Sequence, residues 1–159
     1  MIEPYEELVE GEINLRIPPG PRHEEICRRL HERVAAGLAA TSPAKLLPPR
    51  TKVELSPSNH FCPDLTLVTT VGNKFWLAAE VINSGDHNFD TVIKKSIYEQ
   101  IKIPRLWMID PRYNNVEIYH GNEYGITLKE ILALNDVLTE PLLPCFQLPL
   151  NKLFQLSAE

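Results

Sequence analysis

Two apolar segments separated by a short turn constrain the fold of this chain most. Residues 65–70 and 75–82 are apolar on both faces of an extended chain, which is typical of strands in the centre of a covered sheet. Gly72 and Asn73, which lie between them, are residues favoured in tight turns. The pattern therefore predicts an antiparallel pair of buried strands.

Four-residue spacing of apolar side chains predicts two helices around this pair. Residues 21–40 form the first, and residues 88 or 90 to 102 form the second, with Asp90 as a candidate N-cap. The apolar positions are Ile26, Leu30, Val34 and Leu38 in the first helix and Ile93, Ile97 and Ile101 in the second.

The remaining segments predict strands. Residues 5–17 form a hairpin around Glu10 and Gly11, and a proline-rich connection, Pro18, Pro19, Gly20 and Pro21, follows it. Further strands are expected at residues 51–55, 105–109 and 116–119. Residues 127–130 either open a short helix or extend the sheet. The order hairpin, helix, three strands, helix, two strands and C-terminal extension predicts one α/β domain over residues 1–159, with a mixed central sheet.

Composition excludes several classes of protein. With 43% hydrophobic and 23% charged residues, the chain has the composition of a soluble globular domain. Three scattered cysteines do not make a disulfide framework, which favours a reducing compartment. The first eleven residues are acidic where a signal peptide is basic, and no apolar run is long enough to span a membrane. We expect a cytoplasmic protein.

The most informative acidic residues lie at the ends of the central pair. If the loop is Val71, Gly72 and Asn73, Asp64 lies directly opposite Glu80, with β-carbons about 5 Å apart. A two-residue turn would instead place the two side chains on opposite faces. Facing carboxylates repel unless one takes a proton or a cation lies between them, and oxygen ligands of this kind suit Mg²⁺.

Two other interpretations remain open for these residues. Charges near strand ends are usually exposed, although Glu80 interrupts an apolar run and so needs a partner. His60, Cys62 and Asp64 alternate along an extended segment and are a candidate zinc site, which Pro63 and the lack of a clear fourth ligand weaken.

A series of short motifs runs along nearly the whole chain. They are the segments at residues 5–12 (YEELVEGE), 18–23 (PPGPRH), 63–64 (PD), 80–81 (EV), 90–98 (Asp90, Lys94 and Tyr98) and 106–111 (LWMIDP), and the tail 142–149. In this order they resemble the Uma2 family of putative restriction endonucleases, within the PD-(D/E)xK nuclease superfamily.

The resemblance implies a restriction-endonuclease-like core in the order α-β-β-β-α-β. It implies that Asp64 and Glu80 bind Mg²⁺ or Mn²⁺, with the carbonyl of Val81 as a further ligand. The lysine usual two residues after the second acid is absent, since position 82 is Ile, and Lys94 on the following helix matches its replacement. The neighbouring Lys95 is the alternative candidate for this role.

Two N-terminal residues complete the site that the resemblance implies. Glu12 supplies a third acid, or else is a solvated hairpin residue, and His23 orients a phosphate or water, or else caps its helix. Asn83, Ser84 and Gly85 stand where the family usually has Ser-Pro-Ser, so the loop beside the site departs from the pattern.

These residues predict a Mg²⁺-dependent endonuclease acting on DNA, with a catalytically inactive binding or interaction domain of the same fold as the alternative. The net charge of −5 argues against strong binding to nucleic acid, but residues 1–12 hold five acids and no base, so the rest of the chain is neutral. Weak, metal-dependent and salt-sensitive binding is expected, aided by bases between residues 92 and 112. Edge strands carrying Val116, Ile118 and Tyr119 predict a homodimer.

Overall fold

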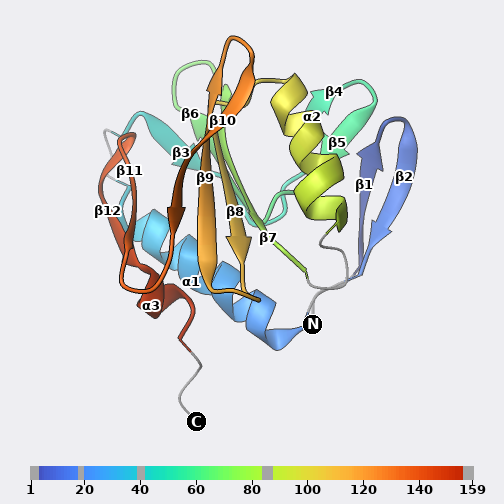
Figure 1. The fold of residues 1–159 in the computed structure, drawn as a ribbon. Helices are drawn as coiled ribbons and strands as arrows, with labels where there is room; N and C mark the ends of the chain where they lie inside the picture. Colours follow the sequence, from blue (N-terminus) through green and yellow to red (C-terminus); the bar gives the residue numbers. More distant parts are fainter. Residues whose placement is uncertain (1–3, 18–19, 39–41, 84–87, 156–159) are drawn as a thin grey trace.

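A mixed six-stranded sheet forms the centre of the protein (Figure 1). The structure is a computed structural model and describes residues 4–17, 20–38, 42–83 and 88–155. The strand order is β10-β9-β8-β7-β6-β3, and only β7 and β8 run parallel. The strands are β3 (Ala44–Leu46), β6 (Leu65–Thr69), β7 (Phe75–Val81), β8 (Arg105–Asp110), β9 (Asn115–Asn122) and β10 (Gly125–Leu132).

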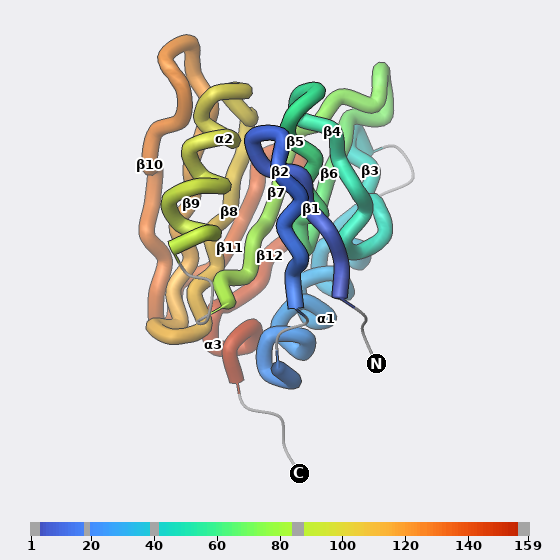
Figure 2. Tube along the Cα trace, turned by 90° about the vertical axis from the view of Figure 1, so that its right-hand side faces the viewer, coloured from blue at the N-terminus to red at the C-terminus, as the bar shows by residue number. Residues whose placement is uncertain are grey.

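A second sheet stands beside the first and carries the N-terminal hairpin. Its order is β2-β1-β5-β4, from β1 (Tyr5–Val9), β2 (Glu12–Arg16), β4 (Val53–Ser56) and β5 (Asn59–Phe61). Figure 2 shows these strands in front of β6 and β7. The second sheet therefore covers β6 and β7 on one side of the central sheet.

The alternation of side chains along β7 divides the core into two layers. Leu77, Ala79 and Val81 face α1 (Pro21–Ala36) together with the C-terminal strands β11 (Val137–Glu140) and β12 (Leu143–Pro149) and the short α3 (Leu150–Leu153). Ala78 and Ile82 face the opposite layer, which contains α2 (Lys95–Gln100). Glu80 lies between Ala78 and Ile82 in the alternation of β7 and points to the same side as they do, so its carboxylate enters an apolar core.

Helix α1 follows the predicted stripe, since Ile26, Leu30 and Val34 are fully buried. The helix ends at Ala36, four residues before the predicted end, and Gly37 is its C-cap. A Cβ at Gly37 would lie 2.9 Å from Cβ of Phe146, so glycine is required where the helix meets β12. Residues 39 and 40, and the predicted connection at 18 and 19, lie outside the described residues.

The second helix begins with a π-helical turn, Phe89–Lys94, which continues into α2. The prediction of Asp90 as N-cap is wrong: Asn88 is the N-cap, and Asp90 is buried inside the first turn, where it pairs with Arg16. Residues 127–130 lie in β10, so the sheet alternative is the one observed. Strands β3, β5, β11 and β12 were not predicted.

The predicted edge strand with Val116, Ile118 and Tyr119 is wrong. Strand β9 lies between β8 and β10, and all three side chains are buried. They therefore offer no surface to a second copy of the chain. No helix within the described residues combines the length and the apolar character needed to span a bilayer.

The turn between β6 and β7 differs from the prediction, but the register at the far end is the predicted one. Thr69 N–H donates to the carbonyl of Lys74 across a four-residue turn. A bulge at Trp76 adds one residue to β7, so Leu65 pairs with Ala79. Without this bulge, the pairing of β6 with β7 would shift by one residue, and Asp64, which precedes β6, would no longer be in register with Glu80.

Candidate functional site

Asp64 lies immediately before β6 and next to the end of β7. The pairing of Leu65 with Ala79 brings it beside the Glu80 and Val81 segment. Its Oδ2 accepts a hydrogen bond of 2.8 Å from the backbone N–H of Val81, and Arg50 Nε donates to Oδ1 at 3.3 Å. The Asp64 carboxylate thus takes the place of a backbone carbonyl as the acceptor for a β7 N–H group, and this hydrogen bond fixes it at the end of the sheet.

Glu80 lies in the opposite layer, where Lys94 reaches it from the helical turn before α2. The Lys94 Nζ lies 2.5 Å from Glu80 Oε2 and 2.9 Å from Glu7 Oε2. The hydroxyl of Tyr98, one helical turn further, donates to Glu80 at 2.8 Å. Lys94 and Tyr98 are four residues apart and so present both groups on the same face. The helix therefore delivers one ammonium and one hydroxyl to two buried carboxylates.

Glu7, on β1, is a member of this cluster that the sequence patterns did not identify. It is 1% exposed and accepts hydrogen bonds from Arg16 Nη1 at 2.7 Å and from the backbone N–H of Cys62 at 2.7 Å. Its signal in the sequence is its two-residue spacing from Val9, which is also buried. The hairpin therefore contributes a carboxylate to the interior.

Glu12, the predicted third acid, is exposed at the start of β2, opposite Val9. Lys95 lies with its Nζ 4.6 Å from the ring centre of Tyr119, away from the carboxylates. Asp64, Glu80 and Lys94 are thus all buried, Lys94 contacts Glu80, and the charge of Asp64 acts on Glu80, whereas Glu12 and Lys95 lie outside this set.

Among the described residues, two groups of ion pairs, which together we call the charged cluster, carry a formal surplus of negative charge, and the charge of Asp64 in one group acts on Glu80 in the other. Arg16 bridges Glu7 and Asp90, Lys94 bridges Glu7 and Glu80, and Arg50 bridges Asp64 and Glu24. These are five acids and three cations, a formal charge of −2. Uncompensated charge in a protein interior costs several kcal/mol, so the cluster needs protons or a bound cation.

The protonation equilibria reflect this surplus. Burial raises the pKa of Glu80 to about 8, and the charges of Glu7 and Asp64 add to that effect while Lys94 opposes it. Burial also acts on Glu7, but Lys94, the Cys62 N–H and Arg16 outweigh it and lower its pKa. Lys94 has a pKa above its ordinary value because Glu80 and Glu7 outweigh the effect of burial. The ammonium is therefore held charged between the two acids.

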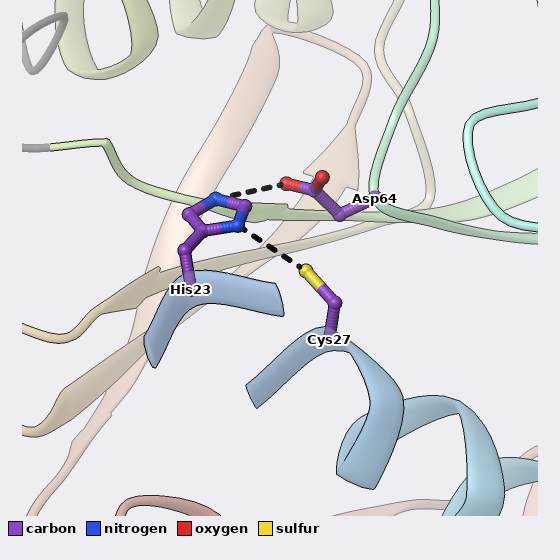
Figure 3. A group of neighbouring side chains, drawn as sticks. All are labelled: His23, Cys27 and Asp64. Atoms are coloured by element: carbon purple, nitrogen blue, oxygen red, sulfur yellow. Dashed lines mark hydrogen bonds and ion pairs between the residues drawn. The ribbon is translucent and has the colours of Figure 1, made fainter. Parts of the chain in front are cut away.

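His23 and Cys27, on the first turns of α1, lie on the other side of Asp64 (Figure 3). His23 Nε2 is 2.6 Å from the carbonyl oxygen of Val81 and 3.9 Å from Asp64 Oδ2. His23 Nδ1 is 3.6 Å from Cys27 Sγ. The predicted position of His23 at the start of the first helix thus places it against the same strand end as Asp64.

The predicted zinc alternative is not assembled. Among the described residues, the one group of three ligand-bearing side chains close enough to share an ion is His23, Cys27 and Asp64. His60 Nε2 instead lies 3.8 Å from Glu54, and Cys62 Sγ contacts the carbonyl of Glu6.

Two cavities open beside the strand end. One of about 280 Å³ is lined by Asp64, Cys27, Arg50 and neighbouring α1 residues, and one of about 320 Å³ by His23, Ile82, Asn83, Arg22 and Arg112. The predicted basic strip is not a single surface, because Lys94 is buried, Arg105 pairs with Glu140 and Arg112 pairs with Asp110. Ser84 and Gly85 lie outside the described residues.

Comparisons with known proteins agree with this architecture. A crystal structure of a putative nuclease belonging to DUF820 from Anabaena variabilis superposes with a TM-score of 0.76 at 14% identity, over 96% of this chain and 91% of that chain. This likeness establishes a nuclease-like α/β fold. No curated protein matches the chain. The family model for Uma2, putative restriction endonuclease, matches residues 3–151, and the chain therefore belongs to the Uma2 family.

Proposed function

We propose that the protein is an endonuclease that hydrolyses phosphodiester bonds of DNA with Mg²⁺ or Mn²⁺. The observation that carries the proposal is the buried, negatively charged cluster in which Asp64 and Glu80 lie on neighbouring strands. Family membership and the nuclease-like fold support the same class of reaction.

The residues present fit a hard divalent cation. Glu80 and the Val81 carbonyl at the end of β7, and Asp64 immediately before β6, offer oxygen ligands, and a double positive charge would neutralise the formal −2 of the cluster. Each of these oxygens retains a lone pair beyond its present hydrogen bond. When bound, such an ion polarises a phosphoryl oxygen and lowers the pKa of a ligated water.

The chain's own residues would orient the ion and stabilise charge. Lys94 offers an ammonium that can offset the charge developing on the phosphate in the transition state. Tyr98 holds the Glu80 carboxylate through its hydroxyl, and Glu7 fixes Lys94 from the other side. Arg16 compensates one of the two negative charges of Glu7 and Asp90, which reduces the competition of Glu7 for Lys94.

Nucleic acid would approach through the cavities at the strand end. Arg50 lines the first, and Arg22 and Arg112 line the second, so each holds a guanidinium able to bind phosphate in a bidentate manner. Because these guanidinium groups already have protein partners, binding should be weak and sensitive to salt.

The test is nicking of supercoiled plasmid in the presence of Mg²⁺ or Mn²⁺. We expect Glu80→Gln to lower the rate about 100-fold or more, whereas Glu130→Gln, a matched change at an exposed position of β10, leaves it unchanged. Equal nicking by the wild type and Glu80→Gln would refute the proposal. Mn²⁺ binding that is lost in Glu80→Gln, without nicking by the wild type, would assign the fold a binding role instead.

A further inference from the structure

We propose that His23, Cys27 and Asp64 form a second metal site, which binds Zn²⁺ or another thiophilic divalent ion. One ligand atom from each residue lies within 4.8 Å of the others, and all three side chains are buried. The donor set of one imidazole nitrogen, one thiolate and one carboxylate is a Zn²⁺ set, in contrast to the all-oxygen ligands of the proposed Mg²⁺ site.

The separation of the His23 and Cys27 donors fits a tetrahedral ion, and the Asp64 carboxylate, whose Oδ2 lies 3.9 Å from His23 Nε2, would shift towards them on binding. Zn–S and Zn–N bonds of about 2.3 and 2.0 Å at a tetrahedral angle place the two donors about 3.5 Å apart. The observed separation of His23 Nδ1 and Cys27 Sγ is 3.6 Å. Four-residue spacing along α1 sets this distance, because residues i and i+4 share one helix face.

The tautomer of His23 that its surroundings favour leaves the correct nitrogen free. The 2.6 Å contact of Nε2 with the Val81 carbonyl requires Nε2 to carry the proton, since a carbonyl oxygen can only accept. Nδ1 is then the unprotonated nitrogen, and it points towards Cys27 (Figure 3). An imidazole that donates to a backbone carbonyl through its other nitrogen is the usual support of a metal-binding histidine.

The cavity beside α1 provides an entry path and a fourth ligand. Cys27, Asp64 and Glu24 all line this cavity, which has a volume of about 280 Å³. Glu24 Oε1 is paired with Arg50 and is not part of this group of three, so a water entering through the cavity would be the fourth ligand. Binding would transfer the Cys27 thiol proton to solvent.

Asp64 belongs to both proposed metal sites, which makes them compete. A thiophilic ion held by Cys27 would draw the Asp64 carboxylate towards α1 and away from Glu80. Zn²⁺ should therefore inhibit Mg²⁺-dependent nicking. This consequence rests on the proposed nuclease function, whereas binding of the thiophilic ion does not.

Co²⁺ is a suitable probe, since a thiolate ligand produces a charge-transfer absorption band in the near ultraviolet. The parent protein should carry Cys145→Ser, because Cys145 is an exposed thiol that could bind the probe adventitiously. We expect this parent to bind one equivalent of Co²⁺ with a thiolate band, and Zn²⁺ to displace the Co²⁺. Cys27→Ser should abolish the band, and Cys62→Ser, a matched change at another buried cysteine, should keep it.

Absence of a thiolate band in the parent, or its persistence in Cys27→Ser, would overturn the proposal. Thermal unfolding of each variant without metal shows whether it is folded, and His23→Gln provides a second variant that must weaken Co²⁺ binding by about tenfold or more. Glu80→Gln should retain the band, since it changes only the other site. A band without nicking would refute the nuclease and leave the thiophilic site standing, and nicking without a band would do the reverse.

Discussion

Replacement of Lys94 by Met tests whether the buried cluster is held together by a single ammonium. Lys94 is 1% exposed and contacts Glu80 and Glu7 at 2.5 and 2.9 Å. Methionine fills a similar volume without the charge, so the change isolates the electrostatic effect. Loss of one partner from a buried ion pair costs about 3–5 kcal/mol, because the remaining charge is left uncompensated. Here two carboxylates are left, and the formal charge of the cluster falls from −2 to −3.

The cost should depend on pH, with a sign that follows from the two carboxyl groups. Burial raises the pKa of Glu80, and without Lys94 it would also raise that of Glu7, so both would bind protons more readily when folded than when unfolded. Groups with a raised folded pKa stabilise at low pH and lose that contribution as pH increases. We therefore expect the full 3–5 kcal/mol near pH 8. The loss should decrease towards pH 5 by up to about 1.4 kcal/mol per pH unit for each proton bound.

Urea unfolding of the wild type and of Lys94→Met at pH 5, 6.5 and 8 measures this difference. Lys95→Met is the matched control: it removes an adjacent ammonium whose main contact is the Tyr119 ring, so its cost should be about 1 kcal/mol or less at every pH. A loss below about 1 kcal/mol for Lys94→Met, or a loss that does not change with pH, would refute the reasoning.

Three further outcomes are expected. In the plasmid assay, Glu7→Gln should lower metal-dependent nicking because Glu7 holds Lys94, while Glu12→Gln, an exposed change in the same hairpin, should leave it unchanged; equal effects would contradict the assignment. Glu80→Gln should remove a pH dependence of stability, so that the wild type loses stability relative to this variant as pH rises from 5 to 8 in urea unfolding without metal. Gly121→Ala should lower the free energy of unfolding by about 1–3 kcal/mol, because its Cβ would lie 2.3 Å from the carbonyl oxygen of Ile103. Gly20→Ala, with open space around it, should cost about 0.5 kcal/mol or less, because the poorer N-cap of α1 is offset by the lower entropy of the unfolded chain; similar values for the two would exclude the close contact at Gly121.

The spacing of apolar residues predicted the helices and strands that are buried on one face or on both faces. The stripe of α1 and the double-faced apolar runs of β6 and β7 are patterns of this kind, and the structure has them at nearly the predicted positions. Strand β3 has only three residues, Ala44–Leu46, too few for a two-residue period to show. The C-terminal strands pack beneath α1, where partner and register come from tertiary contacts that local sequence does not encode.

The register at Asp64 was predicted correctly through an incorrect turn. The three-residue loop that the prediction assumed does not exist, and the bulge at Trp76 restores the pairing of Leu65 with Ala79. A bulge has no strong signal in an apolar run, since either neighbour can carry the extra residue. Sequence therefore indicated the register that sets Asp64 beside the Glu80 end of β7, but not the turn that produces it.

The N-terminal hairpin was predicted correctly, but Glu12 was predicted as its functional acid, whereas Glu7 is the acid that the structure buries. Glu7 and Glu12 both lie on predicted strands, and each is part of an acidic segment. What separates them is the second sheet: β1 lies between β2 and β5, so the inward face of β1 meets Phe61 and α2 residues. Strand β5 was not predicted, and without it no face of the hairpin could be identified as the buried one. Arg16, at the end of β2, reaches the same interior, where it contacts Glu7 and also Asp90, which lies 74 residues further along the chain than Arg16. The hairpin is thus part of the charged cluster, and it ties the N-terminal segment to the helix that carries Lys94.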